Sequence, residues 1–117
     1  MNSDELSERF LNFAAEIIKL FSLLSKTYVR RHIGGQLVRA ATSAGANYEE
    51  ARGAESRADF MHKLQIVLKE LRESLYWLRL IKRTKLIQSE RINPLISESK
   101  ELTNIIAKSV VTAKAKK

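Results

Sequence analysis

The sequence predicts an all-α fold, an antiparallel up-and-down four-helix bundle in a single domain. Apolar residues recur three and four positions apart along four separate stretches, which is the spacing of one buried helix face. The 117 residues include one proline and four glycines, so helices have few places at which they must stop. Short connections favour antiparallel neighbours. We expect the bundle over residues 1–112 and a lysine-rich tail over residues 113–117.

The first helix is expected over residues 4–24, because its apolar residues alternate between spacings of four and three, as in a bundle seam. Leu11 and Ile18 lie one heptad apart and away from this seam, so we expect them on the outer surface. The seam itself consists of Leu6, Phe10, Phe13, Ile17, Leu20 and Leu24.

The second helix is expected from about residue 32 to residue 52, where Gly53 ends it. We interpret Gly34 and Gly35 as a turn at the start of this helix, since they lack the preceding strand and the following lysine of a phosphate loop. The small residues on its core face would let a neighbouring helix come close. That face comprises Leu37, Ala41, Ala44, Tyr48 and Ala51.

A line of polar residues runs beside this core face. Their spacing allows each side chain to reach the next across one helical turn. We interpret the line as a structural polar network, with a partner-binding edge as the alternative. Its members are Arg39, Ser43, Asn47 and Glu50.

Two capping signals predict where the third and fourth helices begin. Ser56 with Asp59 three residues later is typical of a capping box, and Asn93 followed by Pro94 is typical of an N-cap and a first helical residue. The third helix has a core stripe of Phe60, Leu64, Val67, Leu68, Leu71, Leu75 and Leu78. The fourth continues through Leu95, Leu102, Ile106 and Val110.

A second stripe on the third helix indicates self-association. At about 100° per residue, its side chains fall on the side away from the core stripe. A monomer would leave them exposed, and a tryptophan grouped with aliphatic residues forms a patch, although isolated exposed apolar side chains are normal. The expected oligomer interface comprises Ile66, Tyr76, Trp77 and Leu80.

The formal net charge of +8 and the pI near 10.0 favour a polyanionic partner. An up-and-down bundle brings the first and third connections to the same end, and both connections are basic. We therefore predict a nucleic-acid-binding end. The alternative is that these cations are solvated and only complement helix dipoles. The predicted binding residues are Lys26, Arg30, Arg31, Lys82, Arg83, Lys85 and Arg91.

Side chains for catalysis or metal binding are scarce. The chain has no cysteine and only two histidines, so we expect no catalytic residue, metal site or cofactor. Asp59 and His62 form an acid-x-x-His pair, but a stable metal site needs about four ligands. Acids at the N-terminus and charges within the most apolar stretch predict neither an export signal nor a membrane span, which favours a cytoplasmic location.

Three runs of sequence resemble a known family. They are TSAGANYEEA over residues 42–51, AESRADFMHKLQIVLKE over residues 54–70 and ESLYWLRLI over residues 73–81. In order and spacing they resemble the four-helix bundle family named for proteins encoded inside intervening sequences of bacterial 23S rRNA genes. The chain departs from a common family pattern at Ala44 and Ser74, where valine and threonine are frequent. The positions that match the family include Asn47, Glu50, Tyr76 and Trp77.

The resemblance implies a bacterial, cytoplasmic, non-enzymatic bundle that assembles into a ring-shaped pentamer. A related branch, the accessory proteins of diversity-generating retroelements, is similar in fold and binds nucleic acid and a reverse transcriptase. That function transfers only by analogy of fold. We therefore expect a homo-oligomer that binds RNA or DNA through its basic end. The alternative is a purely structural module, or one with a protein partner, whose positive charge serves solubility.

Overall fold

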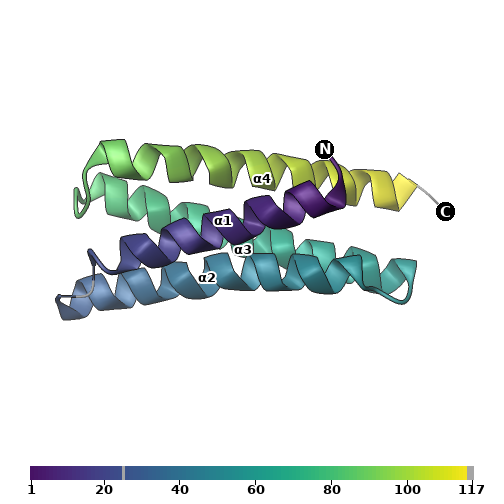
Figure 1. The fold of residues 1–117 in the computed structure, drawn as a ribbon, viewed down its shortest axis with the longest axis horizontal. Helices are drawn as coiled ribbons and strands as arrows, with labels where there is room; N and C mark the ends of the chain where they lie inside the picture. Colours follow the sequence, from purple (N-terminus) through teal and green to yellow (C-terminus); the bar gives the residue numbers. More distant parts are fainter. Residues whose placement is uncertain (25, 116–117) are drawn as a thin grey trace.

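The computed structural model describes residues 1–24 and 26–115, and it confirms the all-α, up-and-down four-helix bundle (Figure 1). Successive helices run in opposite directions and form a rod of 49 × 21 × 20 Å. The packing of α2 against α3 is the most extensive, and that of α1 against α4 the least. The helices are α1 (Ser3–Phe21), α2 (Tyr28–Arg52), α3 (Arg57–Arg83) and α4 (Ser89–Ala115).

The start of α2 differs from the expectation by a full turn. Thr27 is its N-cap, and the threonine hydroxyl accepts a hydrogen bond of 3.2 Å from the backbone N–H of Arg30. Gly34 and Gly35 therefore lie inside the helix, and their interpretation as a turn is wrong. A Cβ on Gly34 would lie 2.5 Å from Cδ1 of Phe21, so this glycine allows α1 and α2 to approach closely.

The start of α4 also differs from the expectation. The helix begins at Ser89, so Asn93 is not its N-cap and Pro94 lies inside it. Pro94 gives up only the hydrogen bond to the carbonyl of Glu90, in the second turn, and Ile92 ahead of it is fully buried. Burial of a side chain of that size offsets much of the cost of an internal proline, about 3 kcal/mol. At its other end α4 continues through residues 113–115, and residues 116–117 lie outside the described part of the chain.

The N-cap at Ser56 and the stop at Gly53 are confirmed, but the described hydrogen bonds do not include the reciprocal bond of a capping box at Ser56, and α1 ends at Phe21 rather than at residue 24. Ser56 caps α3, where its hydroxyl accepts a hydrogen bond of 3.0 Å from the backbone N–H of Asp59. Gly53 directly follows α2. A capping box at α1, in which Asn2 and Glu5 bond to each other's backbone, was not anticipated.

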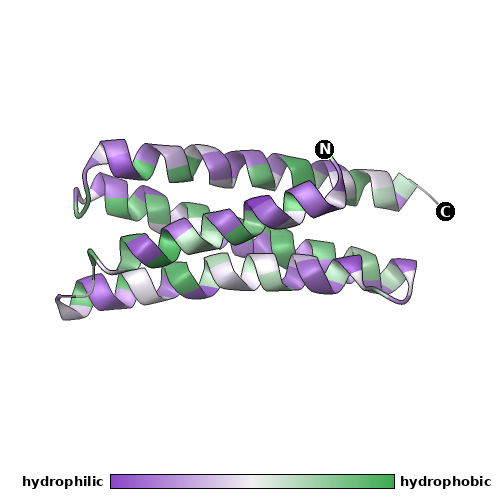
Figure 2. Ribbon diagram, viewed as in Figure 1, coloured by the Kyte–Doolittle hydropathy of each residue, from purple (hydrophilic) through white to green (hydrophobic). Residues whose placement is uncertain are grey.

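The core lies where the apolar periodicity placed it. Every seam residue of α1 and every core-face residue of α2 is buried. On α3 the stripe holds with partial exposure at Phe60, Leu68 and Leu75. Hydrophobic and hydrophilic bands alternate along each helix, as one buried face per helix requires (Figure 2). Leu11 and Ile18 are exposed, as expected.

Candidate nucleic-acid interface

The fold brings the two basic connections to the same end of the rod. The turn between α1 and α2 and the turn between α3 and α4 lie together at one end of Figure 1, away from the start of α1 and the end of α4. All seven predicted binding residues therefore belong to one pole of the molecule. We call it the basic end, and it comprises Lys26, Arg30, Arg31, Lys82, Arg83, Lys85 and Arg91.

A hollow of about 790 Å³ opens at the α3–α4 half of the basic end. Lys82, Arg83 and Lys85 line it, while Ile87 and Ile96 contribute apolar surface. Two further lining cations, Arg79 and Lys100, were missed by the sequence reading. Arg79 lies one turn before Arg83 on α3 and could have been found from that spacing. Lys100 comes from α4, and only the packing of α3 against α4 places it there.

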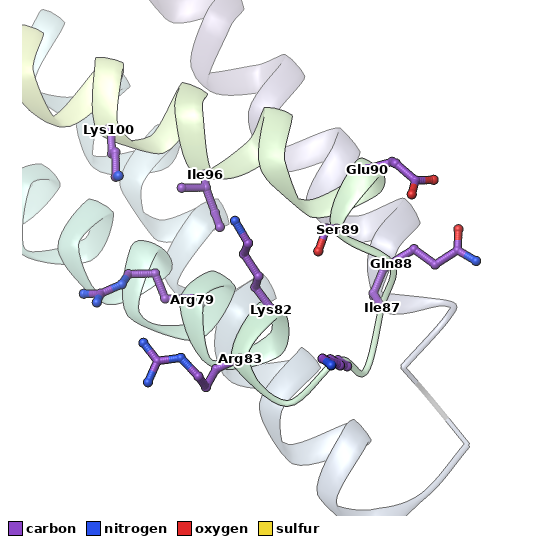
Figure 3. Close-up of a pocket in the computed structure, with 10 residues that line it drawn as sticks. Arg79, Lys82, Arg83, Ile87, Gln88, Ser89, Glu90, Ile96 and Lys100 are labelled. Atoms are coloured by element: carbon purple, nitrogen blue, oxygen red, sulfur yellow. The ribbon is translucent and has the colours of Figure 1, made fainter.

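The only acid that lines this hollow does not face its cations. Figure 3 shows Arg79, Lys82 and Arg83 rising from α3, whereas the side chains of Gln88 and Glu90 point away from that helix. The carboxylate of Glu90 is therefore badly placed to neutralise the α3 cations. The hollow keeps a strongly positive wall.

Cations at the basic end also lack ion-pair partners among the described residues, whereas five cations elsewhere have them. Within residues 1–24 and 26–115, ion pairs engage Arg9, Lys19, Arg39, Arg52 and Lys63. None of the seven residues of the basic end forms one, nor do Arg79 and Lys100 in that described part. At the opposite end, Arg52 pairs with Asp4 and Glu49. The uncompensated charge is thus concentrated at one pole.

Lys85 has a backbone conformation that lysine rarely adopts. Its φ is 57°, in the left-handed region, where glycine or asparagine is the usual residue. It follows the Thr84 C-cap of α3 in a Schellman motif, in which the N–H of Leu86 bonds to the carbonyl of Ile81 and that of Lys85 to Lys82. A lysine here costs about 1 kcal/mol relative to glycine. In return, the turn carries a cation at the rim of the hollow.

Two members of the polar line on α2, Arg39 and Glu50, form ion pairs with α3. Arg39 pairs with Glu70, at 3.2 Å, and with Glu73. The Glu50 carboxylate accepts from Nζ of Lys63 at 2.8 Å. Within the line, only Ser43 and Asn47 are bonded to each other. The amide nitrogen of Asn47 donates to Oγ of Ser43 at 3.1 Å. The intrahelical spacing did not predict that Arg39 and Glu50 would reach another helix.

Glu73 is the junction of this arrangement. Hydrogen bonds from Arg39 and then from Trp77 lower the pKa of its carboxyl below the ordinary value near 4.5. The charged form is therefore favoured. Its carboxylate ties α2 to α3 and orients the indole of Trp77.

The second stripe of α3 is less exposed than expected. Trp77 and Leu80 are half-buried and pack against the core, and Ile66 is half-buried as well. The expectation that a monomer leaves the whole stripe in water is therefore wrong, since α2 begins at Tyr28 and its first turns lie beside α3. Tyr76 remains 57% exposed.

Two features are absent from the described part of the chain: a cluster of metal ligands and an apolar helix of membrane-spanning length. Within residues 1–24 and 26–115, no three His, Asp or Glu side chains gather as the ligands of a metal ion would. None of the described helices combines the length and hydrophobicity needed to cross a bilayer.

Comparison with known proteins places this fold in a group. The sequence pattern of the family described as 23S rRNA-intervening sequence protein matches residues 5–108. A crystal structure from Bacteroides thetaiotaomicron, titled a protein with unknown function from the S23 ribosomal protein family, superposes with a TM-score of 0.84. The two chains are 36% identical, and the match covers 90% of this chain and 97% of that one. No curated protein matches the chain.

Proposed function

This chain belongs to the 23S rRNA-intervening sequence protein family, and from this premise we propose that it is a non-enzymatic, homo-oligomeric bundle that binds nucleic acid through its basic end. One observation carries the proposal. The cations at this end have no carboxylate partners among the described residues, whereas Arg9, Arg39, Arg52 and Lys63, towards the middle and the opposite end of the rod, are paired. Phosphate groups are the natural counter-charges for such a cluster.

The expected binding mode is electrostatic. Lysine and arginine contacts to phosphates release condensed counterions, so affinity falls steeply with salt. Such contacts position the nucleic acid without reading its bases, and sequence preference is therefore weak.

Oligomerisation would multiply these contacts. In a ring of parallel subunits, pentameric as the resemblance implies, the basic end recurs around one rim, and weak contacts add through effective concentration. A groove of about 580 Å³ between α1 and α2 offers a subunit contact in place of the stripe on α3, most of which is half-buried. Leu11 and Ile18, exposed by 63% and 51%, lie at this groove, and small residues line its floor: Ala14, Ala15, Gly45 and Ala46.

The same groove favours a second candidate, a protein-interaction module without nucleic-acid binding. Apolar side chains beside small residues accept the apolar face of an amphipathic helix. On this alternative, the unpaired cations only keep the protein soluble.

A charge-neutralised variant distinguishes the two functions. Arg30, Arg31, Arg83 and Lys85 are changed together to Gln, and binding to labelled RNA and DNA is measured by fluorescence anisotropy across a salt series. We expect this variant to lose most of its affinity. A control changes the same number of cations away from the basic end, at Lys69, Arg72, Lys108 and Lys114, and retains binding. If the basic-end variant binds as wild type does, or a variant lacking the residues after Val111 alone loses binding, the proposed function is wrong.

A further inference from the structure

Four aromatic rings form a row across α2 and α3 at the basic end. Tyr28 stacks on His32, with ring centroids 6.4 Å apart and an interplanar angle of 16°. His32 meets Trp77 edge-on at 6.2 Å, and Trp77 meets Tyr76 edge-on at 5.1 Å. The two outer rings are open to solvent, with Tyr28 75% and Tyr76 57% exposed. Large aromatic side chains exposed to solvent beside a cluster of cations are typical of a binding site.

The centre of this row is held firmly. Nε1 of Trp77 donates to the Glu73 carboxylate at 3.1 Å, and Glu73 is in turn paired with Arg39 of α2. Trp77 also packs against the core. Tyr76 therefore packs against a fixed neighbour, and a ligand that stacks on its ring costs little side-chain conformational entropy.

Arginines connect the row to the positive hollow. A small recess of about 190 Å³ is lined by Tyr76, Arg79, Leu80 and Arg83. Arg79 and Arg83 also line the hollow that holds Lys82, Lys85 and Lys100. The exposed face of Tyr76 and the phosphate-attracting hollow thus share two guanidinium groups. At the other end of the row, Tyr28 is followed in the sequence by Arg30 and Arg31.

We propose that this face binds single-stranded nucleic acid, with bases stacked on Tyr76 and Tyr28 and the backbone phosphates held by Arg79, Arg83 and the hollow. The inference rests on the proposed function and specifies its ligand. Aromatic platforms interleaved with cations suit unpaired bases, because any base offers a π-face while the backbone follows the positive groove. A duplex keeps its bases stacked within, so the exposed tyrosines would gain nothing from it.

The test compares an oligothymidylate with a duplex of equal charge at fixed salt. Tyr76→Ala is expected to weaken single-strand binding about 5- to 150-fold, the range that corresponds to loss of one stacked base, and to leave duplex binding unchanged. Tyr76→Phe keeps the ring and should bind like wild type. Val111→Ala removes an exposed apolar side chain near the opposite end of the rod and serves as the control. Trp77, the single tryptophan, lies 5.1 Å from Tyr76, so its fluorescence should respond to the single strand.

The outcomes separate this inference from the proposed function. Equal affinity of Tyr76→Ala and wild type for the single strand overturns the inference alone, provided that wild type binds and the basic-end variant does not. Loss of the oligomer in Tyr76→Ala, seen by light scattering while single-strand affinity per subunit is kept, also overturns it and assigns the ring to a subunit contact. If wild type binds neither single strand nor duplex, both proposals fail.

Discussion

The indole Nε1 of Trp77 donates a hydrogen bond of 3.1 Å to Oε2 of Glu73, one turn earlier on α3. The same carboxylate oxygen pairs with Arg39 from α2. Glu73 therefore helps to tie together α2 and α3, the pair of helices with the most extensive packing, and holds Trp77 of the aromatic row in place.

This junction predicts acid sensitivity. The Glu73 pKa is lower in the folded protein than its ordinary value near 4.5, so its stabilising contribution is present above that value and lost as the pH falls through the lowered pKa. Glu73→Gln should therefore be less stable than wild type near neutral pH, and the difference should shrink in acid. Urea unfolding across the pH range measures it. Glu55→Gln removes an exposed carboxylate that has no cation partner among the described residues, and this control should show no such trend.

Lys85 should show a trade between stability and binding. Lys85→Gly relieves the left-handed backbone and should raise the free energy of unfolding by about 1 kcal/mol, while it weakens nucleic-acid binding through the lost charge. Lys85→Ala removes the same charge but keeps a Cβ at a φ of 57°. It should bind as weakly as Lys85→Gly without the gain in stability. Equal stability of the two variants would contradict the assignment of backbone strain.

The paired glycines of α2 should respond differently to alanine. A Cβ on Gly35 would point into open space, with no neighbouring side chain within 4 Å. Gly35→Ala should therefore stabilise the helix by about 0.5–1 kcal/mol. Gly34→Ala gains the same helix propensity but pushes its Cβ against the ring of Phe21. We expect Gly34→Ala to be less stable than Gly35→Ala by at least about 1 kcal/mol in urea unfolding. The reverse order would mean that Phe21 moves aside freely.

The groove of α1 and α2 should control assembly. Leu11→Glu combined with Ile18→Glu adds two charges to exposed apolar positions, which should dissociate the oligomer and leave a folded monomer. Light scattering gives the mass, and circular dichroism reports the fold. Trp77→Glu, which the sequence alone suggests as the dissociating change, should instead lower monomer stability because Trp77 packs against the core. An unchanged mass of the double variant excludes this groove as the interface.

Binding should follow counterion release. If the five cations of the hollow contact a single strand, log Kd should change with log salt at a slope of magnitude about 3.5. The four-residue basic-end variant removes two of these cations, Arg83 and Lys85, and should reduce that slope by at least about 1.4. A slope unaffected by the variant would place the phosphate contacts elsewhere.

The sequence was sufficient for the features that depend on local pattern. The spacing of Leu6, Phe10 and Phe13 defines a buried face wherever the helix packs, and Ser56 caps α3 through a bond to its own chain. Placement of both basic connections at one end followed from topology alone. These features require no knowledge of which side chains meet across helices.

The features that the sequence missed depend on such meetings. Gly34 looks like a turn residue until Phe21 of α1 is seen against it, and Pro94 looks like a helix start until burial of Ile92 extends α4 backwards. Tyr28 and His32 join Trp77 only because α2 begins a turn earlier than expected. Each is a tertiary contact that outweighs a local preference.

The start of α1 and the end of α4 lie towards the end of the rod opposite the basic end (Figure 1). A fluorescent protein or an affinity tag fused ahead of α1 would therefore stand away from the basic end, along a molecule 49 Å long. A sensor surface that captures such a tag would present the unpaired cations and the tyrosines to the solution, so the geometry of the bundle makes the protein suited to oriented immobilisation.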